Sequence, residues 1–446
     1  MKLRKALGDG GWGWVPGVYF AEGLPFAVAT CVSMVMFSSL GMSNSAMAFW
    51  TGVIGLPWSL KFLWAPLMDA HGTKRRWMLA AQMAIALSFA AIAFVFRSGG
   101  ADGWLIACFL LTAFCSATHD IAADGYYMIA LDPHAQAVCS GLRNIFYKCA
   151  MLAGQGGLVM LAGALNRAGV PERSAWMWAM AGAAVGMVIL FFWHLAATPV
   201  VERTRNRIEE EKDGCPPVRF AESFRSFFLR EGAWRAVLFL FFYRFAEAQL
   251  GKMTVPFMLA PREAGGLGLT IEQQGMIYGS AGSCCFLVGG FFAGVAVARF
   301  GFGRCLWMMA LALNAPDLFY VWLSFSQPSV AVSGVCIALE QFGYGLGYMA
   351  HILFMVQFAN RSGAYKTSHF ALMTGITILG MTLVGMASGV IQEGFARFGA
   401  AFGEGAGYRG FFLWICLCTI PSFLTVRLIR PVLDDRFGKK EESIAE

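Results

Sequence analysis

Hydrophobic residues in this chain come in long blocks separated by short polar stretches. Blocks of about 20 mostly apolar residues, the length that spans a bilayer as a helix, occur twelve times. The pattern therefore predicts an all-α polytopic membrane protein with twelve transmembrane helices. The predicted segments are 14–40, 46–68, 77–96, 103–130, 137–166, 174–198, 232–260, 271–298, 304–326, 329–359, 366–396 and 408–430.

One long polar stretch separates the sixth apolar segment from the seventh. It contains the charged run 202–212, which is followed by Pro216 and Pro217. Its position divides the chain into two sets of six helices. We predict an N-terminal six-helix bundle (1–198), a cytoplasmic linker (199–231), a C-terminal six-helix bundle (232–430) and a cytoplasmic tail (431–446).

Composition agrees with a membrane protein. Only 14% of the 446 residues are charged and 58% are hydrophobic, whereas soluble domains carry about 25% charged residues. So few charges cannot cover a soluble protein of this length. The net charge of +7 comes from Lys and Arg clustered between apolar segments, so the lipid bilayer, and not nucleic acid, is the expected partner.

The loops predict the orientation. The loops on one side, with both termini, hold about 20 Lys and Arg, whereas the opposite loops hold about six. The positive-inside rule then places both termini in the cytoplasm. Lys2, Arg4 and Lys5 precede the first segment, which continues past 20 residues without a small-residue cleavage site, so we interpret it as a membrane helix and not a signal peptide.

The chain contains twelve cysteines, but their positions do not predict a metal or redox site. Most lie inside apolar segments, where a cysteine behaves as a small hydrophobic residue. None has the spacing of a zinc site. We therefore expect no metal and no cofactor.

Weak internal repeats relate the two halves. Phe20-Ala21-Glu22 in the first segment matches Phe245-Ala246-Glu247 in the seventh, and the loop 65–76 aligns with 294–304. Two related halves of six helices are the architecture of the major facilitator superfamily. The loop 65–76 resembles the cytoplasmic loop motif of that superfamily, which assigns conformational roles to Asp69, Gly72, Arg75 and Arg76.

Ionisable residues within the apolar segments are functional candidates. Such a group at the centre of a membrane helix costs roughly 2.5–3.5 kcal/mol even on the lenient scale. The polar and ionisable residues at this depth are Glu22, Lys61, His119, Asp120, Asp124, Arg143, Asn144, Lys148, Arg244, Glu247, Lys252, Asp317, Glu340, His351, Lys366 and His369.

Asp120 and Asp124 are four residues apart and therefore share one helix face. Because two carboxylates this close repel each other, at least one is expected to hold a proton. A carboxylate that alternates between a proton and a cation such as Arg143 or Lys148 would couple transport to protons. We name Asp120, Asp124 and Glu22 as proton-coupling candidates; the alternative is a fixed salt bridge between the fourth and fifth helices.

Other charged positions allow both functional and structural interpretations. Arg244 precedes Glu247 by three residues, so a local ion pair would also explain both. Lys61 lies late in its helix, and its ammonium group can reach the membrane surface. Glu340 opens the Gly/Tyr-rich stretch 343–348, which we expect to form a ligand-facing wall.

His119 and Asp124 also fit a His-x-x-x-x-Asp pattern found in glycerolipid acyltransferases, in which Asp polarises a His base. Two fixed positions in six are weakly specific, and these lie inside an apolar segment. An acyltransferase is therefore a remote alternative, as is a membrane sensor that binds its ligand without moving it. We predict that the chain is not an enzyme.

Several segments resemble the AmpG family of muropeptide permeases. The resemblance implies proton-driven import of anhydromuropeptides (GlcNAc-anhydroMurNAc peptides) from the periplasm across the bacterial inner membrane for cell-wall recycling. The matching segments are 19–25, 60–69, 114–124, 243–247, 340–341 and 369–372.

By this resemblance, Asp120 and Asp124 correspond to paired aspartates of the family, and Lys61, Glu247 and Glu340 fall on charged positions of its pattern. Three positions differ from that pattern: Glu22 replaces a small polar residue, His119 replaces Gln, and Gly125-Tyr126-Tyr127 replaces an Ala-Trp pair. Related branches include siderophore importers, so a siderophore or another peptide-like metabolite is the alternative substrate.

The sequence thus predicts a monomeric secondary transporter with the major facilitator fold, driven by the proton gradient and working by alternating access. Cationic side chains are expected to meet substrate carboxylates, and tyrosines to stack on a sugar. The residues expected to bind this small-molecule substrate are Lys61, His119, Tyr126, Arg143, Asn144, Glu247, Lys252, Glu340, Tyr344 and Tyr348.

Overall fold

The computed structural model describes residues 11–70, 72–100, 102–131, 133–201, 220–361, 366–399, 403, 405–434 and 437. Every regular element in these ranges is a helix. The side chain of Asp69, most of the predicted linker and most of the predicted tail lie outside the described residues. The all-α class predicted from the sequence is confirmed.

The chain forms two compact units. Unit 1 comprises Met1–Leu40, Val53–Pro216 and Ile271–Gly279, and unit 2 comprises Gly41–Gly52, Pro217–Thr270 and Ser280–Glu446. Two short segments, 41–52 and 271–279, thus belong to the unit formed mainly by the other half of the sequence. The domain limits predicted from the sequence stay a prediction.

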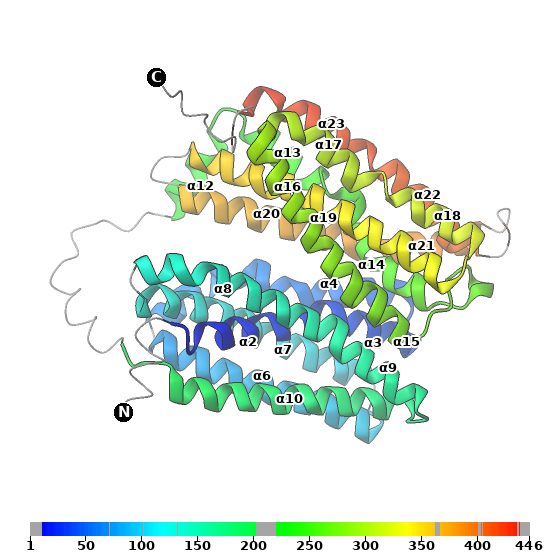
Figure 1. The fold of residues 1–446 in the computed structure, drawn as a ribbon, viewed down its shortest axis with the longest axis horizontal. Coiled ribbons are helices and arrows are strands. Elements are labelled where there is room, and N and C mark those ends of the chain that lie inside the picture. Colours follow the sequence, from blue (N-terminus) through cyan, green and yellow to red (C-terminus); the bar gives the residue numbers. More distant parts are fainter. Residues whose placement is uncertain are drawn as a thin grey trace. The chain divides into compact units, whose positions relative to one another are not determined.

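Unit 1 is built from long helices that pack side by side, among them α6, α7 and α10 (Figure 1). Helix α4 (Asn44–Leu60) begins in unit 2 and ends in unit 1. The other helices of unit 1 are α2 (Val15–Ala27), α3 (Ser33–Ser39), α5 (Ala65–Ala70), α6 (Lys74–Ser98), α7 (Asp102–Ala130), α8 (Pro133–Leu152), α9 (Val159–Arg167), α10 (Glu172–Ala197) and α15 (Ile271–Gln274).

In unit 2, α19 packs against both α16 and α17. The helices of unit 2 are α12 (Phe220–Phe228), α13 (Ala233–Phe242), α14 (Phe245–Leu259), α16 (Ser283–Phe300), α17 (Phe302–Asn314), α18 (Asp317–Ser326), α19 (Val330–Asn360), α20 (Lys366–Met386), α21 (Ser388–Phe398), α22 (Ala406–Cys418) and α23 (Ile420–Ile429). The π-helical segments Val28–Val32, Ala153–Leu158 and Gly275–Gly282 join helices in line.

Ten helices of the described residues are long and apolar enough to cross a membrane. They correspond to ten of the twelve predicted segments. The two others, 46–68 and 232–260, are helical but interrupted: α4 gives way to a 3-10 turn, Lys61–Leu63, before α5, and α13 is separated from α14 at Tyr243 and Arg244.

The two interruptions have different origins. In the first, Pro66 has no N–H to donate to the carbonyl of residue 62 and disfavours helical backbone just before it. In the second there is no proline; the Ser422 hydroxyl of α23 instead donates 2.8 Å to the Tyr243 carbonyl. A side chain of another helix thus gives the Tyr243 carbonyl the hydrogen bond that a backbone N–H would supply in an uninterrupted helix.

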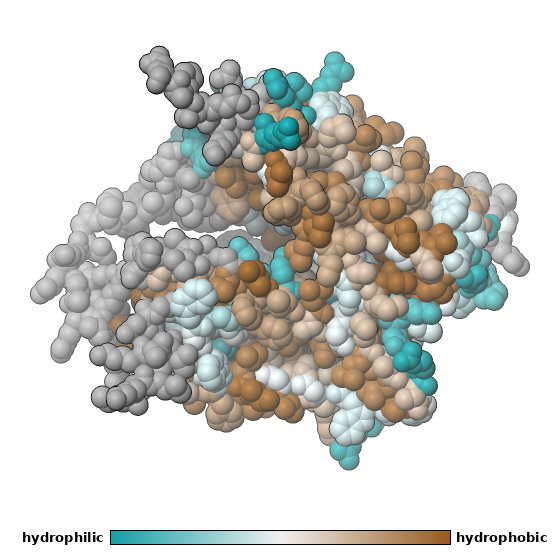
Figure 2. Space-filling view, viewed as in Figure 1, coloured by the Kyte–Doolittle hydropathy of each residue, from teal (hydrophilic) through white to brown (hydrophobic). Residues whose placement is uncertain are grey.

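Large hydrophobic side chains lie on the outside of the helices as well as inside. Leu87 and Phe94 of α6 and Ile189 of α10 are 64%, 66% and 63% exposed, and Figure 2 shows hydrophobic residues over much of the visible face. Soluble monomers rarely expose continuous apolar surface of this kind. The outer helix faces are therefore suited to lipid.

Candidate functional site

Unit 1 contains a charged cluster that we call the acid–base cluster: Glu22, Lys61, Asp120, Asp124 and Arg143. Lys61 pairs with the Asp120 carboxylate. Arg143 NH2 lies 2.8 Å from Asp124 Oδ1. The two predicted helix-depth aspartates thus have separate cations, one from the interruption after α4 and one from α8.

A tyrosine supports the second of these pairs. The Tyr19 hydroxyl of α2 donates 3.0 Å to Asp124 Oδ1, the same oxygen that Arg143 approaches. The Arg143 guanidinium also lies over the Tyr19 ring, 4.6 Å from its centroid. Asp124 therefore links α2, α7 and α8, and movement of either neighbouring helix would alter its partners.

Glu22 is the third acid of the acid–base cluster. It is 7% exposed, and its Oε2 is buried without a hydrogen-bond partner among the described residues. Its carboxyl lies near those of Asp120 and Asp124. The cluster thus holds three carboxyl groups and two cations.

The cations of the acid–base cluster remain accessible. The side chains of Lys61 and Arg143 are 37% and 35% exposed. Since each also holds an aspartate, a solute carboxylate could reach either cation by competing with its aspartate. Asn144, the next residue on α8, is exposed.

Unit 2 contains a second cluster, the arginine–tyrosine cluster, formed by Arg244, Glu247, Tyr344 and Tyr348. Arg244 stands at the interruption between α13 and α14, and its Nε and NH2 lie 2.9 Å and 2.8 Å from Glu247 Oε2. Its NH2 donates 2.6 Å to the Tyr344 hydroxyl, and its guanidinium lies 4.8 Å from the Tyr348 ring centroid.

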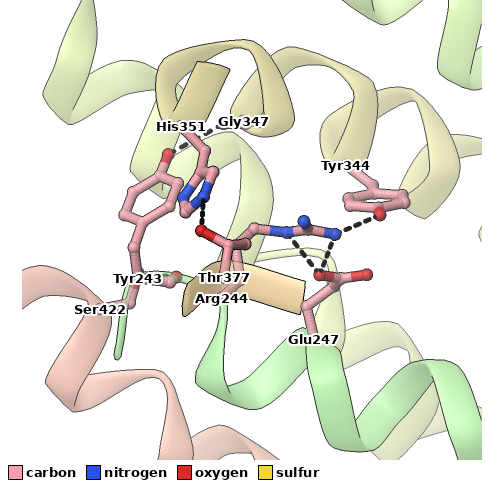
Figure 3. Close-up of polar contacts among 8 residues, drawn as sticks. All are labelled: Tyr243, Arg244, Glu247, Tyr344, Gly347, His351, Thr377 and Ser422. Atoms are coloured by element: carbon pink, nitrogen blue, oxygen red, sulfur yellow. Dashed lines mark hydrogen bonds and ion pairs between the residues drawn. The ribbon is translucent and has the colours of Figure 1, made fainter. Parts of the chain in front are cut away.

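Figure 3 shows that neighbouring side chains diverge at this interruption. Tyr243 extends toward α19, where its hydroxyl donates 3.1 Å to the Gly347 carbonyl, whereas Arg244 extends toward Glu247 and Tyr344. His351 bonds to Thr377 at 2.9 Å in the same region. The ion pair between Arg244 and Glu247, considered from their three-residue spacing in the sequence, does form.

Glu340, Tyr344 and Tyr348 follow one another at four-residue spacing and share a face of α19. Glu340 is 4% exposed, and its Oε2 accepts from the Tyr320 hydroxyl at 3.1 Å and from the Gln341 amide at 3.0 Å. Glu340 thus lies on the same face of α19 as Tyr344 and Tyr348 of the arginine–tyrosine cluster.

The glycines between these residues pack against other helices. A Cβ at Gly343 would lie 2.2 Å from the Ala312 carbonyl oxygen of α17, and one at Gly345 would lie 2.0 Å from the Phe286 carbonyl oxygen of α16. These glycines let α19 approach neighbouring helices, and the ligand-facing wall expected from this stretch stays a prediction.

Lys252, a further predicted binding residue, lies on α14. Its Nζ donates 3.0 Å to the hydroxyl of Thr51 in the first part of α4, and both residues belong to unit 2. The structure thus gives this lysine a hydroxyl partner within unit 2.

His119 and Tyr126 are placed in the core of unit 1. Both have no exposed surface. His119 Nε2 lies 2.9 Å from Gln82 Nε2, and the Tyr126 hydroxyl donates 2.7 Å to the Pro199 carbonyl. This burial favours packing roles over substrate contact. Among the described residues, Asp124 pairs with Tyr19 and Arg143, and His119 pairs with Gln82.

The predicted conformational loop connects α5 to α6. Gly72 has φ 86°, a left-handed conformation that favours glycine. Arg75 donates 2.8 Å to the Leu195 carbonyl and 2.9 Å to the Thr198 hydroxyl at the end of α10, which satisfies a helix C-terminus. The Arg76 backbone N–H is capped by Thr73 at 3.2 Å.

The helix interruptions are a feature that the sequence pattern missed. Lys61 begins one and Arg244 ends the other, so each unit presents a cation where a membrane helix is discontinuous. Discontinuous helices place unpaired backbone groups and charges at transporter binding sites. The sequence signals were Pro66 and the helix-depth charge of Lys61 for the first interruption, and the charge of Arg244 for the second. No group of His, Cys, Asp and Glu within the described ranges could hold a metal ion.

These features define a multi-pass membrane transporter: long apolar helices, interrupted helices and charged clusters at helix depth. Residues 18–390 match the family model described as Major Facilitator Superfamily. The chain belongs to this superfamily, which confirms the predicted fold class and excludes neither of the substrates considered above.

Curated relatives extend over nearly the whole chain. The anhydromuropeptide permease of Escherichia coli (strain K12) is 24% identical over 93% of this chain and 79% of its own length. The putative transporter AmpG 4 of Rickettsia conorii is 22% identical over 90% of this chain and 92% of its own length. The resemblance to the AmpG family noted in the sequence is confirmed by these relatives.

Solved structures share the fold. A bacterial homologue of the human lysosomal transporter Spinster matches with TM-score 0.68 and 15% identity, covering 94% of this chain and 95% of that chain. A D-xylose–proton symporter matches with TM-score 0.65 and 12% identity, covering 98% of this chain and 99% of that chain. At these identities the likeness establishes the fold.

Proposed function

We propose that this protein is a proton-coupled symporter that imports anhydromuropeptides across the bacterial inner membrane. The observation that carries the coupling is the composition of the acid–base cluster, which has three carboxyl groups and two cations. With all three acids ionised, the cluster would hold one uncompensated negative charge at membrane depth, where an unpaired charge is strongly unfavourable. One bound proton makes the cluster neutral.

Glu22 is the acid that we assign to this proton. Lys61 and Arg143 are engaged by Asp120 and Asp124, so among the described residues Glu22 has no cation of its own. When substrate carboxylates engage Lys61 or Arg143, the released aspartates favour uptake of a proton. Binding of substrate and proton is thereby mutually favourable, as symport requires.

The substrate assignment rests on the relatives. Permeases named for anhydromuropeptides match over 93% of this chain, and their substrate class combines carboxylates with sugar rings. The accessible cations of unit 1, Lys61 and Arg143, suit the carboxylates. We further propose that the protein acts as a monomer with both termini in the cytoplasm, and that transport needs only the proton gradient.

The test is counterflow in proteoliposomes that contain the purified full chain. Vesicles loaded with unlabelled GlcNAc-anhydroMurNAc tripeptide should accumulate the radiolabelled compound from outside, and an acidic exterior should drive net uptake. Ferric siderophores are assayed in parallel. Counterflow of a siderophore without counterflow of muropeptide would overturn the substrate assignment. Muropeptide binding without any counterflow would overturn the proposal that the protein is a transporter.

A further inference from the structure

An apolar groove lies on the surface of unit 2, outside both charged clusters. Its volume is about 440 Å³, within the roughly 300–1,000 Å³ of small-molecule sites. Phe300 and Met308 on its rim are 49% and 68% exposed, so the groove opens to the surroundings of the protein. The apolar walls include Ala293, Ala296 and Phe300 of α16, Met308 and Ala312 of α17, and Leu346 of α19.

Arg304 is the charged residue among those that line the groove. It is exposed in the first turn of α17, where the positive end of the helix dipole adds to its charge. Within the described part of the chain it has no hydrogen bond or ion pair. Arg75, at the matching position of the other half, instead donates to Leu195 and Thr198.

The position of Arg304 fits a membrane surface. It lies in the first turn of α17, which packs against α23. Phe302, the first residue of α17, belongs to the same core cluster as Ile429, the last residue of α23. Arg427 is exposed in the last turn of α23 at this same end. Basic pockets at helix ends attract the headgroups of anionic lipids of the cytoplasmic leaflet.

We propose that this groove is a binding site for an anionic phospholipid, with an acyl chain between α16 and α17 and the phosphate at Arg304. The walls supply apolar contact, and the described residues that line them include no carboxylate that would repel the phosphate. The guanidinium supplies charge-assisted donors that an anionic headgroup matches. A zwitterionic lipid carries its own cation and gains less from Arg304, so the site should discriminate by headgroup charge.

The test is native mass spectrometry of the purified full chain in detergent with added dioleoylphosphatidylglycerol, and separately with dioleoylphosphatidylcholine. We expect one phosphatidylglycerol to remain bound under activation that removes phosphatidylcholine. Arg304→Gln should reduce its occupancy about tenfold, the loss typical of a charged hydrogen bond. Arg397→Gln, which removes an exposed arginine in the last turn of α21 and outside the groove lining, should leave occupancy unchanged.

A second pair of variants tests the apolar walls. Ala296→Trp fills the groove and should abolish retention, whereas Val295→Trp, at an exposed neighbour outside the lining, should not. Glycerol 1-phosphate, a headgroup without acyl chains, should fail to displace the lipid. Equal retention of the two lipids, unchanged retention in Arg304→Gln, displacement by glycerol phosphate, or a second protein copy in place of lipid would each overturn the proposal.

Discussion

The acid–base cluster of unit 1 and the arginine–tyrosine cluster of unit 2 differ in which elements supply their ion pairs. In unit 1, Asp120 and Asp124 of α7 meet Lys61 and Arg143 from two other elements. In unit 2, Arg244 and Glu247 are three residues apart at one helix start. Pairs between elements can be broken by helix movement, whereas a pair within one turn moves as a unit.

The cations of the two clusters also differ in exposure. The Arg244 side chain is 7% exposed, whereas those of Lys61 and Arg143 are 37% and 35% exposed. A buried cation suits a fixed scaffold, and an accessible cation suits exchange of its aspartate for a solute carboxylate. We therefore assign a mainly structural role to the unit 2 pair and the coupling role to unit 1.

The largest effect on stability is expected for Arg244→Gln. This change leaves the Glu247 carboxylate buried without its cation, which destabilises proteins by about 3–5 kcal/mol. Thermal unfolding of the purified protein in detergent measures the loss. Combining Arg244→Gln with Glu247→Gln should recover part of it, and a double variant no more stable than the single one would contradict the structural role.

Coupling should be lost in Asp124→Asn. The change removes the charge that holds Arg143 and Tyr19 together, so uptake driven by a pH gradient should fall by about 5- to 150-fold, the usual range of coupling between two ligands. Glu247→Gln is the matched change in unit 2 and should leave the ratio of driven uptake to counterflow near the wild-type value. Unchanged gradient-driven uptake in Asp124→Asn would contradict the assignment of the coupling role to unit 1.

The interruption between α13 and α14 can be tested at Ser422. Ser422→Ala removes the hydroxyl that serves the Tyr243 carbonyl, and leaving a buried acceptor unpaired costs about 1–3 kcal/mol. Ser388→Ala is a suitable control, since that equally buried hydroxyl donates to Gly385 within one turn of its own chain segment. Equal stability losses in the two variants would show that Ser422 has no special role at the interruption.

The smallest effect is expected for Tyr19→Phe. The ring stays over Arg143, while the 3.0 Å hydrogen bond to Asp124 is lost, a change of about 1 kcal/mol. Driven uptake should fall several-fold, with its pH dependence altered because Asp124 loses a donor. Tyr344→Phe, which removes the hydroxyl next to Arg244, should reduce thermal stability and leave the pH dependence of uptake as in wild type.

Much of the fold was predictable because bilayer thickness fixes the length of an apolar block. Ten predicted segments appear as long helices. The interruptions were not predictable from apolar blocks, since Lys61 and Arg244 sit within otherwise hydrophobic stretches. The second interruption depends on Ser422, almost 180 residues further along the chain.

The candidate site was predictable in its residue types and less so in its pairing. Helix-depth charge identified Asp120, Asp124 and Arg143 without knowledge of neighbours, because such charges are unfavourable in lipid. It could not show that Lys61 serves Asp120, since partners on different helices depend on packing. Nor could it show that His119 lies in the core of unit 1 beside Gln82 of α6.

Glu22 provides the most direct test of the coupling mechanism. In proteoliposomes, wild-type uptake of labelled anhydromuropeptide should rise as the external pH falls. The reason is that the acid–base cluster must gain a proton before the loaded protein changes to its inward-facing state. Glu22→Gln mimics the protonated acid, so counterflow should persist while accumulation driven by the pH gradient disappears. Gradient-driven accumulation by Glu22→Gln at the wild-type level and with the wild-type pH dependence would contradict the account.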